Sequence, residues 1–242
     1  MLNACPQASP AQDEPIGLTP ERVPIPRPTA DAAPLDDLRF RQLLGRADWD
    51  ALPPAVRNRF GKRVRPGEAV NYIGRVLSCR ISAFGWVLVQ LCRAIGAPLP
   101  LDQGGGGAAA VSVTEDSSSG GQIWTRLYAR SRGFPQVIHS AKRFAGPTGL
   151  EEYLAAGLGI ALRVRPVAKG LRFVSDHYFL RIGRLRLRWP RWLTPGTLTI
   201  EHLDEGCGTF VFTLALHHRL LGELVVQRSR FSDQHSLEVS DD

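Results

Sequence analysis

The sequence lacks the features that mark membrane-spanning, disulfide-bonded and metal-binding proteins. No segment reaches the ~20 apolar residues that a helix needs to cross a bilayer. The four cysteines are scattered, with no CxxC pair and no histidine at ligand spacing, which favours ordinary thiols in a reducing compartment. No basic and apolar leader precedes Cys5, so a signal peptide is not expected. We therefore predict a cytoplasmic protein with no metal and no other cofactor.

Lysine is also scarce, and the formal net charge of +7 comes almost wholly from arginine. This charge is distributed unevenly. Residues 163–191 carry nine basic side chains against the single acidic Asp176, whereas residues 201–242 are acidic on balance. A basic excess of this kind bears on solubility and on attraction to anions rather than on the fold.

Large apolar side chains are rare near the N-terminus, where much of the proline lies. Residues 1–34 cannot bury enough surface to offset the entropy lost on ordering, and we predict a disordered tail there. Residues 35–231 are long and apolar enough for a single globular domain. The polar residues 232–242 are predicted to form a second disordered tail.

Most of this domain has the alternating pattern of short strands separated by turn residues. About nine strands at such spacing predict an α+β fold that is mostly antiparallel β, with a curved sheet or a partly closed barrel. Short helices are expected near 36–44 and 54–60, and a helical turn at 151–154. The expected strands are 69–81, 109–114, 159–167, 170–182, 184–188, 197–203, 209–217 and 223–230, together with a hairpin over 120–144.

One segment, Ala83–Ile95, predicts a helix that is apolar nearly all round, with Gln90 and Arg93 as its clearly polar residues. Such a helix is normally buried, so we expect it to pack on or inside the sheet. A second interpretation stays open, in which the helix lies in a membrane interface with Trp86 in lipid.

The hairpin of residues 120–144 holds the main candidate site. Trp124, Arg126 and Tyr128 alternate with smaller residues and so share one face of a strand. A face of this composition lines a pocket or decorates a solvated surface, and the residues alone do not distinguish the two.

Several short motifs resemble a known family. They are Trp124-Thr125-Arg126, the strand at Leu171, the segment Pro190–Pro195 that reads PRWLTP, and a late strand at Glu201. Together they are similar to a bacterial domain of unknown function, family 4166, over about residues 38–231. Members of that family occur alone or joined to dehydrogenase-like or DoxX-like membrane modules. The resemblance therefore implies work beside an oxidoreductase or a membrane, with no known reaction.

This chain departs from the family at one place. Relatives tend to end on a Tyr-x-Gly-type strand, whereas residues 226–230 here read VQRSR. If that tyrosine touches a ligand in relatives, the contact is missing in this chain.

The candidate ligand-binding residues are Trp124, Arg126, Tyr128, Ser140 and Glu201. Arg126 offers a bidentate fork for a carboxylate or phosphate, with the aromatic rings as walls. Glu201 is a candidate to pair with Arg126 inside a barrel or to act as a general base, although an outward-facing charge is the favoured interpretation of this residue by itself.

Other polar residues support chemistry less well. Lys142 lies on the return strand and would form a Schiff base if desolvated, but no partner that lowers its pKa is evident in the sequence. Glu151 and Glu152 are interpreted as acids in the first turn of a helix. The adjacent pair His217-His218 faces opposite sides of a strand, so no metal site is expected there.

A basic strand follows at residues 181–192. Arg184, Arg186 and Arg188 share a face and, with Arg191, are candidates for contact with anionic lipid headgroups. No motif for specific nucleic-acid reading accompanies them, so no specific nucleic-acid partner is expected. A simple solvated face is the competing interpretation.

These observations support three hypotheses. The first is a non-catalytic binding module for a small amphipathic or lipid-like ligand, acting in the cytoplasm or at a membrane surface, or beside an oxidoreductase. The second is an enzyme of unknown reaction that uses Glu201 or His139 as acid or base and Arg126 as an anion anchor. The third is a structural interaction domain.

Overall fold

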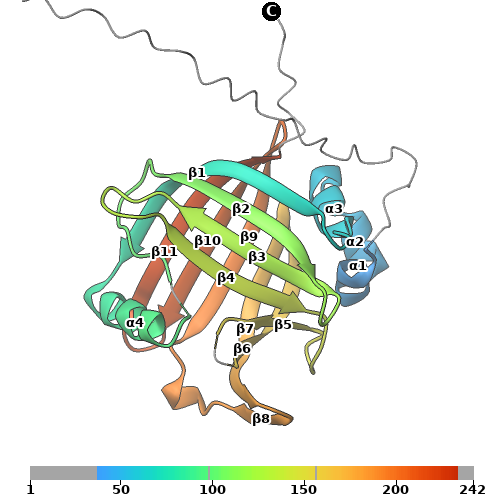
Figure 1. Cartoon of the computed structure of the whole chain (residues 1–242). Helices are drawn as coiled ribbons and strands as arrows, with labels where there is room; N and C mark the ends of the chain where they lie inside the picture. The colour runs from blue at the N-terminus through green and yellow to red at the C-terminus, as the bar shows by residue number, and fades with distance from the viewer. Residues whose placement is uncertain (1–36, 98, 156, 234–242) are drawn as a thin grey trace, which may run out of the picture. The chain divides into compact units, whose positions relative to one another are not determined.

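Antiparallel strands dominate the structure, a computed structural model that describes residues 37–97, 99–155 and 157–233. Those residues contain eleven strands in one sheet, and the pairing of β6 with β7 closes ten of them into a barrel (Figure 1). The eleventh, β8 (Leu185–Arg188), pairs with β7 and lies outside the barrel. The predicted tail 1–34 lies outside the described residues, as do residues 234–242 of the other predicted tail.

The barrel strands follow in chain order, with β1 paired to both β2 and β11. Their bounds are β1 (Ala69–Ile81), β2 (Ala108–Asp116), β3 (Gly121–Tyr128), β4 (Gln136–Arg143), β5 (Leu150–Tyr153), β6 (Leu158–Val167), β7 (Gly170–Ile182), β9 (Thr197–Gly206), β10 (Thr209–His218) and β11 (Gly222–Asp233).

The predicted fold class, mostly antiparallel β with a curved or closing sheet, is confirmed. Residues 151–154 were expected to form a helical turn, and this prediction is wrong. Glu151 and Glu152 belong to strand β5, which pairs with β4 and β6. The strand is short and rich in glutamate, which strands disfavour, so its pairing partners rather than local propensity decide its conformation.

Three short helices cover one end of the barrel. They are α1 (Arg39–Leu44), α2 (Arg46–Asp50) and α3 (Pro54–Gly61). Pro54 occupies the start of α3, as the sequence predicted. The Phe40 ring of α1 is fully buried and makes edge contacts with Phe60, Phe144 and Phe173. The helices thus extend the aromatic core of the barrel.

Helix α4 (Ala83–Ala94) packs on β11 and β1 at the other end. Ser82 caps it by accepting a hydrogen bond from the backbone N–H of Gly85. Gly85 is required by space, because a side-chain carbon there would overlap the carbonyl of Leu224 in β11. The helix lies on the barrel rather than inside it. In the described residues, no helix has the length and apolar character to cross a membrane.

The antiparallel strands therefore define two ends, which are named here after their helices. The α1–α3 end comprises residues 37–68 and the turns 116–121, 144–149, 167–170 and 204–209. The α4 end comprises residues 82–107, 129–135, 180–196 and 217–223.

Candidate ligand site inside the barrel

Strand β3 directs the predicted aromatic and basic residues into the barrel. Trp124, Arg126 and Tyr128 are between 5% and 7% exposed. The sequence predicted that they share a face, and the structure places that face inside, so the alternative of a solvated surface is wrong for them. Val113 and Val111 lie opposite Trp124 and Arg126 on β2. A guanidinium is thereby held in a largely apolar enclosure.

Arg126 belongs to a buried charge cluster with Lys142 and Glu152. The register of β4 and β5 sets Lys142 directly opposite Glu152, and Lys142 Nζ lies 3.2 Å from Glu152 Oε1. Arg126 Nη2 lies 3.5 Å from the same oxygen, while Arg126 Nη1 donates to Ser140 Oγ at 3.1 Å. Two cations therefore share one carboxylate.

The charges in this cluster control one another. Burial alone would raise the pKa of Glu152, but Lys142 and Arg126 outweigh it and lower this pKa to about 2. Burial lowers the pKa of Lys142 to about 8, with help from Arg126 and against the attraction of Glu152. At neutral pH the cluster thus carries an excess of one positive charge inside the barrel.

Glu201 does not join this cluster. It points outward from β9 and pairs with Arg172, whose Nε donates to Glu201 Oε1 at 2.6 Å. The predicted pairing of Glu201 with Arg126 is therefore wrong, and Glu152 takes that place. His139 is also on the outer face, where its Nδ1 lies 3.1 Å from the Thr125 hydroxyl. Neither residue can serve as an acid or base beside Arg126.

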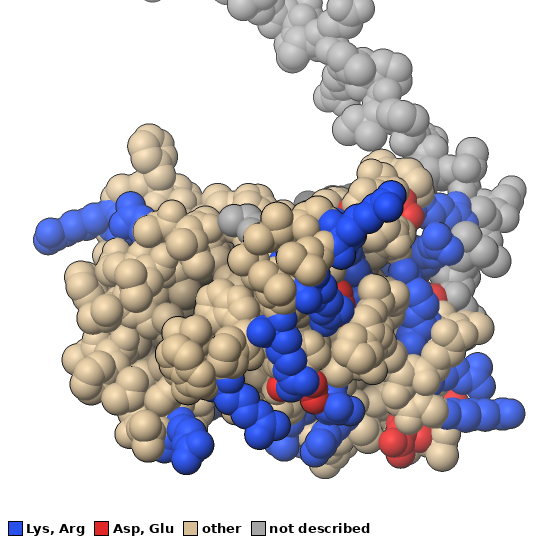
Figure 2. Space-filling view, turned by 90° about the horizontal axis from the view of Figure 1, so that it is seen from below, with Lys and Arg blue, Asp and Glu red and all other residues tan. Residues whose placement is uncertain are grey.

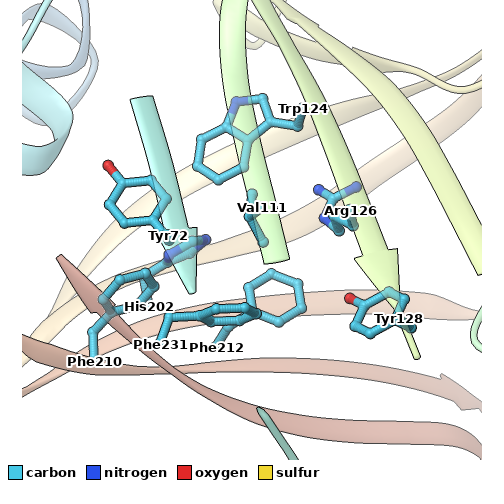
Figure 3. A pocket seen from close by; sticks show the side chains of 9 residues that line it. All are labelled: Tyr72, Val111, Trp124, Arg126, Tyr128, His202, Phe210, Phe212 and Phe231. Carbon is cyan, nitrogen blue, oxygen red and sulfur yellow. The ribbon is translucent and has the colours of Figure 1, made fainter. Parts of the chain in front are cut away.

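Arg126 lines a small cavity whose other walls are mainly aromatic (Figure 3). Its volume is about 10 Å³, which is room for about one water molecule. The lining residues are Tyr72, Val111, Trp124, Arg126, Tyr128, His202, Phe210, Phe212 and Phe231. The rings come from strands on opposite sides of the barrel, so in this conformation they nearly fill its interior.

His202 is a polar group within this aromatic wall. It is 2% exposed and makes edge contacts with the rings of Phe60, Trp124 and Phe212. Its Nδ1 has no hydrogen-bond partner within the described part of the chain. Burial, together with the positive charges of Lys142 and Arg59, lowers the pKa of His202 well below its ordinary value. The imidazole is thus neutral at neutral pH.

A larger cleft opens at the α4 end and reaches the same interior. Its volume is about 250 Å³, slightly below the roughly 300–1,000 Å³ of typical small-molecule pockets. Residues 100–105, Gly107 and residues 129–131 form its rim, while Tyr128 and Gln227 come from the barrel strands. Tyr128 lines both the cleft and the inner cavity. Gln227 is 2% exposed, and its Oε1 has no hydrogen-bond partner among the described residues.

The predicted basic strand divides between two environments. Arg186 turns toward the barrel, where its guanidinium pairs with Glu151 and lies 3.9 Å from the ring centre of Phe179. Arg184, Arg188 and Arg191 are exposed, and none of them forms an ion pair with another described residue.

Sequence reasoning missed the roles of Glu152 and His202. The signal for Glu152 was its even spacing from Leu150, which puts both on one face of a strand, but the glutamate pair suggested a helix start. His202 alternates with the buried Leu198 and Ile200, and that period marked it as inward-facing. Among residues 37–97, 99–155 and 157–233, no group of three His, Cys, Asp or Glu side chains could hold a metal ion.

Fold and interior together define a ten-stranded antiparallel β-barrel protein with a buried cationic site. Residues 52–231 match the model of a family described as "Domain of unknown function (DUF4166)", and the chain belongs to this family. The resemblance drawn from its short motifs is thus confirmed. No curated protein and no solved structure matches the chain.

Proposed function

We propose that this protein is a binding module for a small amphipathic anion. The acidic group of the ligand pairs with Arg126, and its apolar part lies against the rings of the barrel interior. One observation carries the proposal: Arg126 and Lys142 share the single carboxylate of Glu152 in a buried, aromatic surrounding. A second anion would balance the excess positive charge where burial makes that charge costly.

The contacts of Arg126 support it as the anchor. Its separation from Glu152 is 3.5 Å, longer than the 2.7–2.9 Å of a strong charge-assisted hydrogen bond. Lys142 is the closer partner of Glu152. A carboxylate or phosphate that approaches Arg126 therefore competes with a weak contact, while the Lys142–Glu152 pair stays intact.

The cleft at the α4 end supplies the route and most of the space. Tyr128 stands between the cleft and Arg126, so the ligand enters the interior when this side chain turns aside. Gln227 Oε1 can accept a hydrogen bond from a ligand donor in the cleft. A few polar groups in an apolar enclosure are typical of small-molecule sites.

A first experiment is native mass spectrometry of the gently purified wild-type protein, Arg126→Met and Arg172→Met. Arg126→Met leaves the Lys142–Glu152 pair neutral, and Arg172→Met removes a matched guanidinium from the outer face. We expect a co-purifying small acid in the wild type and in Arg172→Met, and its loss in Arg126→Met.

Defined probes then test affinity. Decanoate, decyl phosphate and decanol are titrated against a bound dansylated fatty acid. We expect both anions to displace it from the wild type and to lose about tenfold or more in affinity for Arg126→Met, a change of about 1.4 kcal/mol. Decanol should bind both proteins alike. Equal binding of decanoate and decanol by the wild type, or binding of neither, would overturn the proposal and favour a structural interaction domain.

A further inference from the structure

The α4 end exposes most of the large apolar side chains on the protein surface. Among the described residues seventeen such side chains are exposed, and thirteen of them lie at this end. The other four are Leu38, Ile73, Leu127 and Val137. Monomeric soluble proteins seldom gather exposed apolar groups in this way, and such a patch marks an interaction site.

Helix α4 contributes four of these thirteen side chains, and Ile95 follows directly after its end. Phe84, Val87 and Leu91 follow the i, i+3, i+7 spacing of one helix face and are 59%, 54% and 61% exposed. Trp86 and Ile95 flank them at 53% and 50%. The opposite face of the helix holds the buried Gly85 and Val89. The helix therefore presents apolar groups both to the barrel and to the outside.

Two further segments adjoin the helix. The turn between β10 and β11 carries Leu220, 79% exposed, and leads directly to Leu224, on which α4 rests. The 3₁₀ turn η1 (Arg191–Leu193) carries Trp192, also 79% exposed. Gly196, just after η1, packs against the carbonyl of His217, which lies in β10 directly before the same β10–β11 turn. The three segments thus follow one another around the end of the barrel.

The charge of this end is strongly basic. Its segments contain nine arginines and two carboxylates, a formal excess of seven positive charges. Both carboxylates are already paired, Asp102 with Arg130 and Glu223 with Arg80. Arg184, Arg188 and Arg191 have no ion-pair partner among the described residues. Figure 2, seen from below, shows basic side chains grouped beside a broad uncharged area on the side of α4.

We propose that the α4 end docks on an anionic phospholipid bilayer. The apolar side chains of α4 and η1 enter the boundary between headgroups and acyl chains, and the unpaired arginines meet the lipid phosphates. Tryptophan beside exposed aliphatic groups and a rim of arginine is the composition of proteins that lie in a membrane interface. The proposal does not depend on the ligand site in the barrel.

Flotation with lipid vesicles tests this docking. The full-length protein is mixed with vesicles of pure phosphatidylcholine or of phosphatidylcholine with 30% phosphatidylglycerol, and bound protein is measured. We expect binding to the anionic vesicles at low salt, and a marked decrease at 0.5 M NaCl because salt screens the headgroup charge. Pure phosphatidylcholine should retain at least about tenfold less protein.

Two variants and their matched controls locate the surface. Leu91→Gln/Trp192→Gln removes exposed apolar groups, with Ile73→Gln/Leu127→Gln on the barrel wall as control. The triple variant that replaces the unpaired arginines with glutamine is matched by Arg46→Gln/Arg163→Gln/Arg172→Gln, whose arginines lie outside the α4 end. We expect each α4-end variant to lose about tenfold or more in vesicle affinity while its control is unchanged.

Because all substituted residues are exposed, thermal unfolding should stay cooperative and close to that of the wild type, which excludes misfolding as a cause. The arginine control should unfold at a slightly lower temperature, because it loses three surface ion pairs. Three results would overturn the proposal. They are no binding to anionic vesicles, equal losses in the variants and their controls, and a wild-type oligomer in solution that Leu91→Gln/Trp192→Gln dissociates. The last result would assign this surface to a second copy of the chain.

Discussion

The two ends of the barrel differ in what covers them. At the α1–α3 end, one exposed large apolar side chain, Leu38, is found among the described residues, and nine basic residues are offset by seven acidic ones. At the α4 end the corresponding numbers are thirteen exposed apolar side chains and nine basic against two acidic residues. One end is closed by the chain itself, and the other is left apolar and basic.

The helices at the two ends also differ in how much they contribute to the buried core. The helices of the α1–α3 end insert aromatic rings into the barrel, and Phe60 reaches as far as His202 in the interior. Helix α4 instead contributes few buried side chains. The comparison teaches that a helix can be a strongly apolar segment of a sequence and still bury only a small part of its side chains, here Val89, in the core.

Substitution of one ring at each end should give the largest contrast. Phe40→Ala at the α1–α3 end removes a fully buried ring that contacts three others, and we expect a loss of about 3–5 kcal/mol in the free energy of unfolding. Phe84→Ala on α4 removes a ring that is 59% exposed and should change it by about 0.5 kcal/mol or less. Urea unfolding measures the free energy of unfolding of both variants. Similar losses in the two would contradict the difference in packing between the two ends.

The buried charge cluster gives a second test, because it stabilises the interior between the two ends. Glu152→Gln leaves Lys142 and Arg126 buried without a carboxylate, and we expect a loss of up to about 3–5 kcal/mol. Glu152→Gln/Lys142→Met should recover a large part of it by removing one unpaired charge. The outer pair provides the control, since Glu201→Gln should cost at most about 1 kcal/mol. If Glu152→Gln were as harmless, solvent would have to reach the cluster.

The pH dependence of stability gives the finest test, through His202 beneath the α1–α3 helices. Its pKa is lowered in the folded state by burial, so between that pKa and the ordinary value near 6.5 the unfolded chain binds an extra proton. The free energy of unfolding should therefore fall as the pH drops from 7 to 5, by at most about 1.4 kcal/mol per pH unit from this group.

His202→Phe should flatten this slope, because phenylalanine suits the surrounding rings and does not titrate. His139→Phe on the outer face is the control and should keep the wild-type slope. Denaturant unfolding at several pH values measures the slopes. An unchanged slope in His202→Phe would mean that His202 is already accessible to protons in the folded state.

Much of the fold could be predicted from the sequence, because alternation with period two survives in nearly every strand. The inward faces of β3 and β9 follow this pattern directly. Strand β5 could not be predicted, since its glutamates are poor strand formers and its conformation depends on β4 and β6, which are distant contacts. The error at β5 also hid the partner of Arg126.

Part of the candidate site could be predicted from the sequence as well, again because strand residues alternate with period two. The inward face of Trp124, Arg126 and Tyr128 follows from local alternation, whereas the choice between Glu152 and Glu201 as the ion-pair partner depends on barrel closure and register. The burial of α4 was overestimated because composition reports how apolar a helix is and not how much of it the barrel can cover. Only a three-dimensional arrangement supplies that last quantity.

Helix α4 is positioned by its backbone, since Gly85 lies directly on the Leu224 carbonyl and Ser82 donates its own N–H to the same oxygen. As a consequence, the backbone contacts that hold the helix on the barrel are separate from the side chains that the helix exposes. Substitution of its outer side chains therefore leaves the contacts between the helix and the barrel unchanged. The sequence of the outer face of α4 can thus vary while the position of the helix on the barrel is kept.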